Sequence, residues 1–381
     1  MSLSANWSFP TSIRFGAGRI AELAVACEAC GIKKPLLVTD AGLKNQPITS
    51  DALDRLLGAG LGAALFADVQ SNPTDQNLDT GVEAFRAGGH DGVVAFGGGS
   101  GLDLGKLVAF MAGQTRPVWD FEDIGDWWTR ADDAAIAPIV AVPTTAGTGS
   151  EVGRASVLTN SAEHVKKVIF HPKILPQIVI ADPELTTGMP KAITVGTGMD
   201  AVAHSLEAYC APSYHPICEG IAVEGMRLVK GNLPLVYKDG SNLEARGHMM
   251  TAAAMGATAF QKGLGAIHAL SHPVGALFDT HHGMTNAVVM PEILRFNRTA
   301  IEAKINRLAA FLEIEGGFDG FFEFVLDLRR ALNVPDKLSG LGVTPDQIPK
   351  MAKMAPLDPT AGGNPVELTE EAAAELFERL I

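Results

Sequence analysis

The amino-acid sequence predicts two parts, an α/β domain followed by an all-helical domain. Buried-type strands alternate with helical segments in the N-terminal half, whereas the pattern after residue 188 is almost wholly helical. At 381 residues the chain also exceeds the size at which one hydrophobic core keeps growing. Turn signals between Asp182 and Pro190 mark the change of pattern, so we place the domains at residues 1–187 and 188–381.

The strand that begins at Pro35 ends in a carboxylate, Asp40. In a doubly wound nucleotide-binding domain, an acid at the end of such a strand accepts hydrogen bonds from the ribose hydroxyls of adenosine. The same carboxylate would repel the 2'-phosphate of NADP, so Asp40 favours NAD over NADP. The alternative is that Asp40 only caps the helix that follows.

A glycine-rich turn follows the buried strand at residues 91–96. It reads Gly97-Gly98-Gly99-Ser100-Gly101-Leu102-Asp103-Leu104-Gly105-Lys106 and opens an apolar helical pattern. Glycines let the backbone approach phosphate oxygens, and the free N–H groups of a helix start favour their negative charge. Neither standard fingerprint fits, because the Rossmann pattern needs glycine at position 102 and the P-loop pattern needs Ser or Thr at position 107. The alternative is a tight connection without a ligand.

A third buried strand, at residues 139–142, opens into a loop of small and hydroxyl-bearing residues. The loop reads Pro143-Thr144-Thr145-Ala146-Gly147-Thr148-Gly149-Ser150-Glu151-Val152. Hydroxyls and free backbone N–H groups of such a loop suit a ribose or a phosphate, whereas the alternative is an ordinary solvated turn.

Carboxylate and imidazole side chains recur at helical spacing in the second half of the chain. Asp200 and His204 are four residues apart on one helix face, His268 and His272 repeat that step in a second apolar helix, and the turn at 281–283 follows. Each histidine alone is readily explained as a core residue bonded to a carbonyl. Together, with few Lys or Arg nearby, they are hard to bury without a cation. A mixed Asp and His set suits Fe(II) or Zn(II), and the sequence does not choose between them.

These motifs resemble those of the iron-containing (group III) alcohol dehydrogenases. The resemblance covers nearly the whole chain, with the motifs at 97–106 and 143–152 and both metal-type groups in the family's order. It implies a Rossmann-like α/β N-terminal nucleotide-binding domain, an all-α C-terminal metal-binding domain, and a reaction in the cleft between them.

The resemblance also assigns site residues by position. The residues that match the family's metal ligands are Asp200, His204, His268 and His282, and His272 matches a further histidine beside the substrate. The residues that match cofactor-binding positions, or belong to the matching motifs, are Asp40, Asn72, Gly97, Gly98, Gly99, Ser100, Asp103, Thr144, Thr145 and Lys167.

The activity implied by the resemblance is that of a metal-dependent, NAD-linked alcohol dehydrogenase or aldehyde reductase. Hydride would pass between nicotinamide and a small primary alcohol or aldehyde, with the alkoxide bound to a divalent metal, Fe(II) in preference to Zn(II). His272 is our candidate to relay the alcohol proton, and the alternative is that it orients a ligand or the nicotinamide ribose. Gly153, Arg154 and the Trp127–Trp128 pair differ from the usual residues of the family and leave the substrate open.

The amino-acid composition limits the kinds of molecule that the protein is expected to bind. A formal charge of −13 argues against nucleic acid and against an anionic membrane surface. The first ten residues lack the charged and apolar regions of a signal peptide, no apolar stretch reaches spanning length, and four cysteines fit a reducing compartment, so we expect a cytoplasmic protein. A homodimer is expected from the resemblance alone.

Other functions are compatible with parts of the pattern. A reductase of the maleylacetate type works without a metal, and the complete ligand set argues against it. A lyase of the dehydroquinate synthase type needs several Lys and Arg for its phosphorylated, carboxylated substrate, and these are scarce around the histidines. A non-catalytic nucleotide or metal sensor would not need both halves of a redox site.

Overall fold

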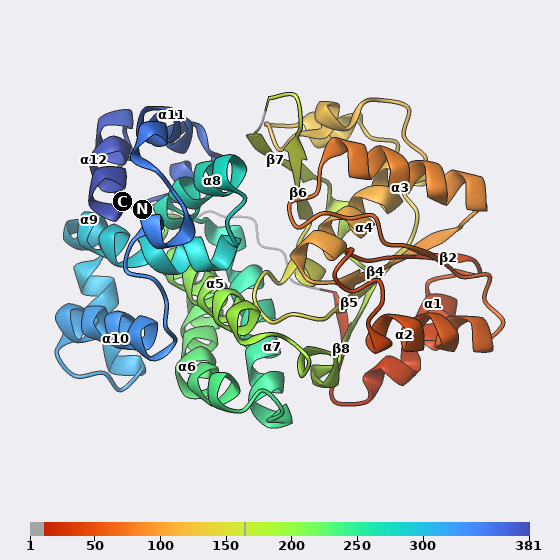
Figure 1. Cartoon of the computed structure of the whole chain (residues 1–381), viewed down its shortest axis with the longest axis horizontal. Helices are drawn as coiled ribbons and strands as arrows, with labels where there is room; N and C mark the ends of the chain where they lie inside the picture. The colour runs from red at the N-terminus through yellow and green to blue at the C-terminus, as the bar shows by residue number, and fades with distance from the viewer. Residues whose placement is uncertain (1–10, 164) are drawn as a thin grey trace. The chain divides into compact units, whose positions relative to one another are not determined.

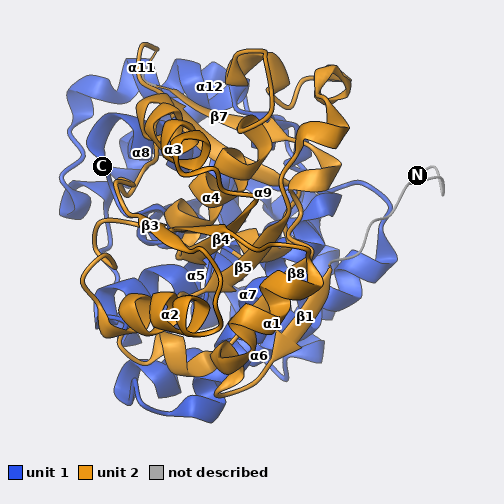
Figure 2. Ribbon diagram, turned by 90° about the vertical axis from the view of Figure 1, so that its right-hand side faces the viewer, with its two compact units in different colours: residues 1–9, 146–148, 189–381 blue, residues 10–145, 149–188 orange. Residues whose placement is uncertain are grey.

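The computed structural model describes residues 11–163 and 165–381, which form two compact units. The α/β unit comprises Pro10–Thr145 and Gly149–Gly188, and the helical unit comprises Ala146–Thr148 and Met189–Ile381 (Figure 2). Three residues of the hydroxyl-rich loop, 146–148, thus group with the helical unit. The N-terminal segment for which the sequence predicts no signal peptide lies outside the described residues.

The α/β unit is built on a six-stranded sheet in which every neighbouring pair of strands is parallel (Figure 1). The spatial order is β1-β8-β5-β4-β2-β3, with strands β1 (Ser12–Phe15), β2 (Pro35–Val38), β3 (Ala64–Phe66), β4 (Gly92–Gly97), β5 (Ile139–Pro143) and β8 (Ile178–Ala181). The chain runs outward from β2 to β3 and then returns to place β4 on the other side of β2. The strand order therefore switches between β2 and β4, and doubly wound sheets bind ligands at the carboxyl ends of the strands beside such a switch.

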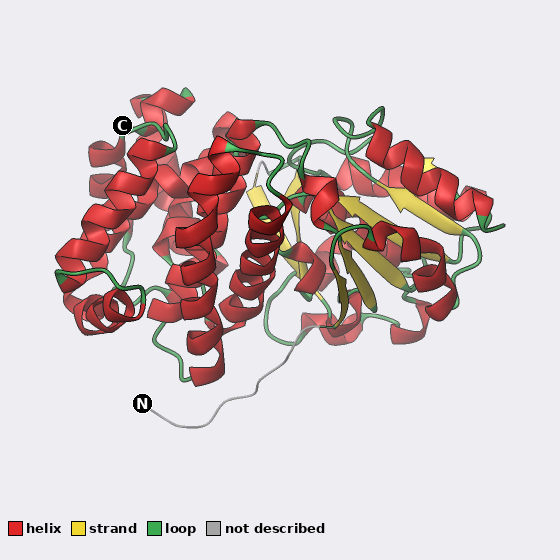
Figure 3. Ribbon diagram, turned by 90° about the horizontal axis from the view of Figure 1, so that it is seen from below, coloured by secondary structure: helices red, strands yellow, loops and turns green. Residues whose placement is uncertain are grey.

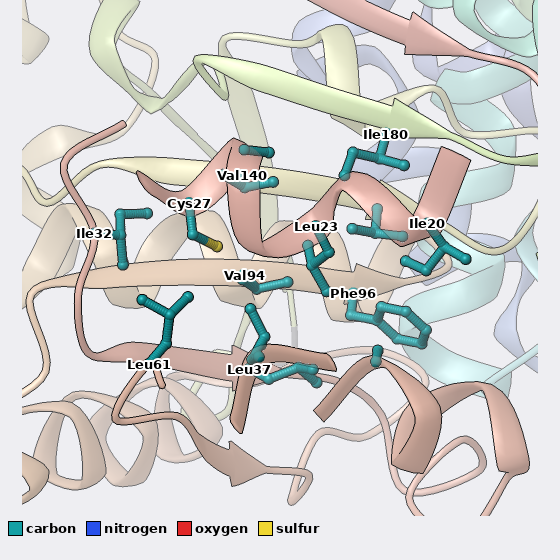
Figure 4. Packing of buried hydrophobic residues seen from close by; sticks show 14 of the residues in the cluster. Ile20, Leu23, Cys27, Ile32, Leu37, Leu61, Val94, Phe96, Val140 and Ile180 are labelled. Atoms are coloured by element: carbon teal, nitrogen blue, oxygen red, sulfur yellow. The ribbon is translucent and has the colours of Figure 1, made fainter. Parts of the chain in front are cut away.

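One face of this sheet is covered by α1 (Leu23–Ala29) and α2 (Pro47–Gly58). Their apolar side chains form a buried cluster with alternate residues of the strands (Figure 4), among them Leu23, Cys27, Leu37, Leu56, Val94, Phe96, Val140 and Ile180. Successive side chains of a strand point to opposite faces, which explains why Val94 and Phe96 join this cluster and Ala95 does not.

The other face is covered by α4 (Gly99–Met111), against which α3 (Asp75–Gly88) packs. A Cβ added at Gly105 of α4 would come within 2.7 Å of the Ala95 Cβ, so the helix lies directly on β4. β2, β4 and β5 are buried throughout, as expected for central parallel strands with helices on both faces.

A two-stranded antiparallel hairpin, β6 (Ala155–Asn160) and β7 (Val165–Phe170), is attached to α4 by buried polar groups. The Asp103 Oδ2 accepts a hydrogen bond from the Val157 N–H at 3.0 Å. The fully buried Lys106 ammonium donates to the Ser150 Oγ at 2.9 Å and to the Ala155 carbonyl at 2.5 Å. These bonds fix the loop at 150–155 against the helix that starts at the glycine-rich turn.

The helical unit contains no β-strand among its described residues (Figure 3). Its α-helices are α5 (Lys191–Cys210), α6 (Pro216–Lys238), α7 (Leu243–Ala259), α8 (Ala266–Phe278), α9 (His282–Phe311), α10 (Gly317–Ala331), α11 (Ile348–Met354) and α12 (Glu370–Leu380). Every residue of α5 from Thr194 to Cys210 is buried, because α6, α7 and α9 pack around this helix. The predicted fold class, α/β followed by all-α, is confirmed.

One local prediction is wrong. His282 lies at the start of the 30-residue helix α9, where the sequence pattern suggested a turn at 281–283. The His281 side chain supplies the N-cap, since its Nδ1 accepts a hydrogen bond from the Met284 N–H at 3.3 Å. Histidine is an uncommon residue for this role, so the usual Ser, Thr, Asp or Asn signal for a helix start is missing.

No helix in the described part of the chain is both long and apolar enough to cross a lipid bilayer.

Glu151 gives the α/β unit a pH-dependent stability. Burial raises the pKa of this carboxyl from 4.5 to about 7, against the lowering effect of Lys106. The folded state therefore holds a proton between these two pH values that the unfolded state has lost, and stability falls as the pH rises through this window. Glu151→Gln has no proton to lose, so its unfolding free energy relative to the parent should rise from pH 4.5 to 8 by on the order of 3 kcal/mol. Urea unfolding across this range measures the difference, with exposed Glu83→Gln as control; a flat difference for Glu151→Gln would contradict the assignment.

Candidate metal centre and nucleotide-binding loops

Three helices of the helical unit bring four of the sequence-predicted side chains together. Asp200 and His204 lie one turn apart on α5, His268 on α8, and His282 at the start of α9. The Asp200 Oδ1 lies 3.7 Å from the His204 Nε2, 3.8 Å from the His268 Nε2 and 3.5 Å from the His282 Nε2. One carboxylate oxygen thus faces three imidazole nitrogens of the same kind.

These separations fit a single ion. An ion about 2.1 Å from each of four tetrahedral ligand atoms would hold those atoms about 3.4 Å apart. The three distances from the Asp200 Oδ1, 3.5 to 3.8 Å, lie close to that value. Of the four residues, Asp200, His204 and His268 offer ligand atoms that all lie within 4.8 Å of one another. One O and three N ligands also form the mixed set that iron and zinc accept. The residues present therefore fit a divalent first-row metal.

Glycines let the ligand-bearing helices come this close. A Cβ at Gly283, next to His282, would lie 2.1 Å from the Gly196 carbonyl oxygen and 2.9 Å from the Asp200 Cβ. Since real Cβ atoms do not approach a carbonyl oxygen so closely, only glycine at position 283 allows α9 to start against α5. A Cβ at Gly256 of α7 would likewise lie 3.0 Å from the Cβ of His204.

Two acids hold the α8 histidines by the ring nitrogen that faces away from the ligand position. The His268 Nδ1 lies 2.5 Å from the Glu207 Oε2, and the other oxygen of Glu207 accepts from the Ile267 N–H at 2.6 Å. The His272 Nδ1 lies 2.7 Å from the Asp358 Oδ2. A carboxylate bonded to Nδ1 leaves the Nε2 lone pair free to accept or to coordinate.

The protonation states suit metal binding. Burial lowers the pKa of His204 from 6.5 to about 4, in spite of Asp200, so its imidazole is neutral at physiological pH. Burial also opposes the charged form of His268, but the Glu207 and Asp200 carboxylates outweigh it and raise the pKa. An ion replaces the proton at such a site, because a metal ligand must have its lone pair free.

His272 lies beside the four candidate ligands. Its ring stacks on that of His282 with centroids 5.4 Å apart, and it meets the His268 ring edge-on at 5.9 Å. Its side chain is 14% exposed, between those of His204 and His268, at 5% and 2%, and that of His282, at 29%. The ring contacts place His272 beside His268 and His282, and its part in proton relay stays a prediction.

In the α/β unit, predicted cofactor residues gather at the carboxyl ends of β2, β4 and β5. Asp40 follows β2, and a Cβ at Gly97 would lie 3.4 Å from its Oδ2, so the two positions flank the strand-order switch. The Asp40 Oδ1 accepts from the Leu43 N–H at 3.1 Å. The capping role considered for Asp40 is therefore present, and it leaves the second oxygen for another donor.

The glycine-rich turn has the geometry of an anion site. Gly97 has φ of 139°, a conformation that side chains rarely allow, and α4 starts two residues later, with Gly98 as N-cap. A Cβ at Gly101 would lie 2.7 Å from the Phe96 carbonyl oxygen. The N–H groups of the first turn of α4, at Gly99, Ser100 and Gly101, have no partner within the helix and can bind a phosphate.

The remaining predicted cofactor residues are spread over the same unit. The Thr144 N–H donates to the Gly97 carbonyl at 2.9 Å, and a Cβ at Gly98 would lie 3.0 Å from the Thr145 methyl, so these threonines adjoin the turn. Asn72 precedes α3, in a segment whose Ser71 carbonyl accepts from the Ser100 hydroxyl. Lys167 lies on β7 and pairs with Glu163 and Glu122 at 3.0 and 3.4 Å.

Asp103 makes different contacts from those of its neighbours in the glycine-rich motif at 97–106. Both its oxygens serve the hairpin attachment, one bonded to the Ser150 hydroxyl and the other to the Val157 N–H. Its side chain is 12% exposed, with Lys106 at 3.7 Å. This placement explains the residue as a support for the turn, and a direct cofactor contact stays a prediction.

Sequence reasoning missed three residues of the metal centre: Glu207, Asp358 and Asn286. Glu207 follows His204 by three positions. This spacing places both residues on the same side of α5, so the sequence did contain a signal for Glu207. Asn286 lies four positions after His282, a signal that the assumption of a turn at 281–283 concealed. Asp358 belongs to a loop with no helical spacing to any ligand, so no local pattern marks it.

Comparison with known proteins decides the family. A sequence model described as "Iron-containing alcohol dehydrogenase" matches residues 10–183, and one described as "Fe-containing alcohol dehydrogenase family, C-terminal" matches residues 194–381. The chain belongs to the iron-containing alcohol dehydrogenase family. The predicted family and enzyme class are confirmed, since the chain is an oxidoreductase of the alcohol dehydrogenase type. The predicted iron agrees with the family's description, and the predicted NAD agrees with a relative named as an NAD-dependent methanol dehydrogenase, from Bacillus methanolicus.

Individual relatives of this iron-containing dehydrogenase cover nearly its whole length. A 4-hydroxybutyrate dehydrogenase of Cupriavidus necator is 38% identical over 381 residues, 97% of each chain. The crystal structure of a 1,3-propanediol oxidoreductase matches with a TM-score of 0.94 and 35% identity, covering 99% of this chain and 100% of the other. A maleylacetate reductase from Agrobacterium tumefaciens matches less well, with a TM-score of 0.80 and 31% identity over 100% and 99%.

Removal of one candidate ligand tests the metal assignment. His282→Ala deletes a nitrogen that faces Asp200 at 3.5 Å. We expect the purified variant to lose bound metal and at least about a hundredfold in turnover, because outer-shell changes alone cost tenfold to hundredfold and this is a direct ligand. NADH fluorescence titration should remain unchanged. His248→Ala, on α7, is the control, and full metal content in His282→Ala would exclude His282 as a ligand.

Proposed function

We propose that this dehydrogenase catalyses the reversible, NAD(H)-dependent interconversion of a small primary alcohol and its aldehyde. The observation that carries the proposal is the convergence of three imidazole nitrogens on the buried Asp200 Oδ1. We assign the metal to Asp200, His204, His268 and His282. When bound there, a divalent cation supplies the Lewis acidity that polarises the oxygen of an alcohol or aldehyde.

The protein's own residues prepare this chemistry. Glu207 orients His268 through the Nδ1 bond, and burial keeps His204 neutral. Apolar packing around α5 limits water near the buried carboxylate, which strengthens its interaction with a cation. Hydride transfer itself needs no covalent enzyme intermediate.

We assign proton relay to His272. Asp358 bonds its Nδ1 at 2.7 Å, so the Nε2 has the lone pair with which to accept a proton. Asp358 is stabilised as a carboxylate, because His272 and the Thr360 hydroxyl and N–H outweigh burial and lower its pKa. The bond therefore fixes the imidazole tautomer as well as its orientation.

For the cofactor we propose that the turn at 97–101 binds the pyrophosphate and that Asp40 binds the adenosine ribose. The free N–H groups at the start of α4 support the first assignment. The place of Asp40 beside the strand-order switch supports the second. Asn72, Thr144, Thr145 and Lys167 are proposed as further contacts.

The substrate we propose is a short alcohol with a polar far end. The relatives described above act on 4-hydroxybutyrate and on 1,3-propanediol, both three- or four-carbon primary alcohols with a second polar group. We also propose a cytoplasmic homodimer. Four free cysteines fit a reducing compartment, and the edge strand β1 exposes Ile13 and Phe15, which a second copy would cover.

The central experiment combines metal analysis with a substrate panel. The chelated apoprotein should be inactive and should recover activity with Fe(II) or Zn(II), while NADH binding persists without metal. Short diols and 4-hydroxybutyrate should be oxidised with NAD. His272→Ala should retain metal and lose about a hundredfold or more in turnover, as expected for general-base removal. Turnover that survives complete chelation would overturn the proposed function.

The preference of the enzyme for NAD or NADP tests the role proposed for Asp40. Without the carboxylate, a 2'-phosphate meets no repulsion, so Asp40→Gly should raise the ratio of NADP to NAD efficiency (kcat/KM) by about tenfold or more, which is 1.4 kcal/mol or more. Asp40→Asn keeps an oxygen for the Leu43 N–H and isolates the effect of charge. Exposed Asp68→Ala is the control. An unchanged ratio in both Asp40 variants would remove this residue from the cofactor site.

A further inference from the structure

The Asn286 carboxamide lies against the candidate metal ligands. The residue is on α9, one turn after His282, and is completely buried. Its Nδ2 lies 2.8 Å from the Asp200 Oδ1, 3.3 Å from the His268 Nε2 and 3.2 Å from the His282 Nε2. One amide nitrogen therefore contacts three of the four candidate ligand atoms.

The orientation of this amide follows from its neighbours. An Asn side chain placed the other way round would set its oxygen 2.8 Å from the Asp200 carboxylate, and two such oxygens repel each other. The His268 Nδ1 is bonded to Glu207, so the Nε2 of His268 is an acceptor as well. The contacts to Asp200 and His268 call for a donor, and the NH2 group, with its two hydrogens, is the donor that Asn286 has.

The opposite end of the amide has no competing role. The Asn286 Oδ1 is buried and has no hydrogen-bond partner among the residues that the structure describes. A residue that served only to connect α9 to its surroundings would use this oxygen. Its hydrogen bonds go to the ligand set, which sets Asn286 apart from the other buried asparagines of the unit: Asn297 and Asn364 bond each other through both amide ends.

We propose that Asn286 is a positioning residue that preorganises the metal centre. The NH2 group donates to Asp200 and holds that carboxylate toward the three imidazoles, while a carboxylate oxygen with two lone pairs can accept this bond and still bind a cation. In the metal-free protein the same hydrogens offset the repulsion between lone pairs that point at one another. This inference rests on the proposed function, since it takes Asp200, His268 and His282 as ligands.

The test uses the affinity of the full-length apoprotein for Zn(II), measured by competition with a chromophoric chelator. Asn286→Leu removes the donor at similar volume and should weaken Zn(II) binding by about tenfold to hundredfold. The melting temperature of the apoprotein should change little, because the loss of the bond to Asp200 opposes the gain from removing a buried oxygen without a partner. Thr258→Val, which deletes a buried hydroxyl bonded to the Ala254 carbonyl on α7, is the matched control and should bind Zn(II) like the parent.

A second variant keeps the inference testable if Asn286→Leu does not fold. Asn286→Ala places the best helix former at a position inside α9, and a water molecule can occupy the space and donate in place of the amide. It should fold and lose less affinity than Asn286→Leu. In an Asp200→Asn background, Asn286→Leu should cost little further affinity, since the two residues act through one hydrogen bond.

The outcomes separate this inference from the proposed function. If the parent does not bind Zn(II) more tightly than Asp200→Asn does, the metal assignment itself is wrong. If the parent binds through Asp200 but the Asn286 variants bind equally well or more tightly, the metal centre stands and the positioning role of Asn286 is overturned. An equal loss of affinity with and without Asp200 would likewise overturn it, because the effect would not pass through that carboxylate.

Discussion

The helical unit is organised around one buried charge, the Asp200 carboxylate. Its side chain is 4% exposed, and its ion-pair partners among the described residues are imidazoles that burial or a neighbouring acid constrains. A carboxylate in such surroundings is costly unless a positive charge lies beside it. With His204 kept neutral, a proton on that imidazole cannot supply the charge at physiological pH. A metal ion bound by the candidate ligands would supply that charge.

Close helix packing is what makes this arrangement possible, and glycine provides it in both units. Gly283 lets α9 begin against the Gly196 carbonyl of α5, so that His282 and Asp200 face each other. In the α/β unit, Gly105 lets α4 lie directly on β4, which places the free N–H groups of its first turn beside the end of that strand. In each case a side chain at the glycine position would collide with the neighbouring helix or strand, so the two elements could not pack this closely.

Spacing along a helix was the part of the site that the sequence predicted best. The four-residue step from Asp200 to His204, and from His268 to His272, places each pair on one helix face whatever the surrounding fold. The strand and glycine signals around Gly97 were equally local, because positive φ at one residue and a helix start just after it are properties of a short segment. Asp103 has contacts that such local reasoning does not find, since its oxygens bond Ser150 and Val157, about fifty positions away.

The sequence by itself determined the fold class, the family and the residue types able to bind a metal, since these depend on periodicity, glycine placement and side-chain chemistry. Only the tertiary structure decided which groups complete the site. Asp358 reaches His272 from 86 positions away, Glu207 reaches His268 from 61, and Asn286 reaches Asp200 from 86. No spacing rule links such pairs, because their contact depends on how three helices and a loop pack, and that packing is set by the sum of all their buried surfaces.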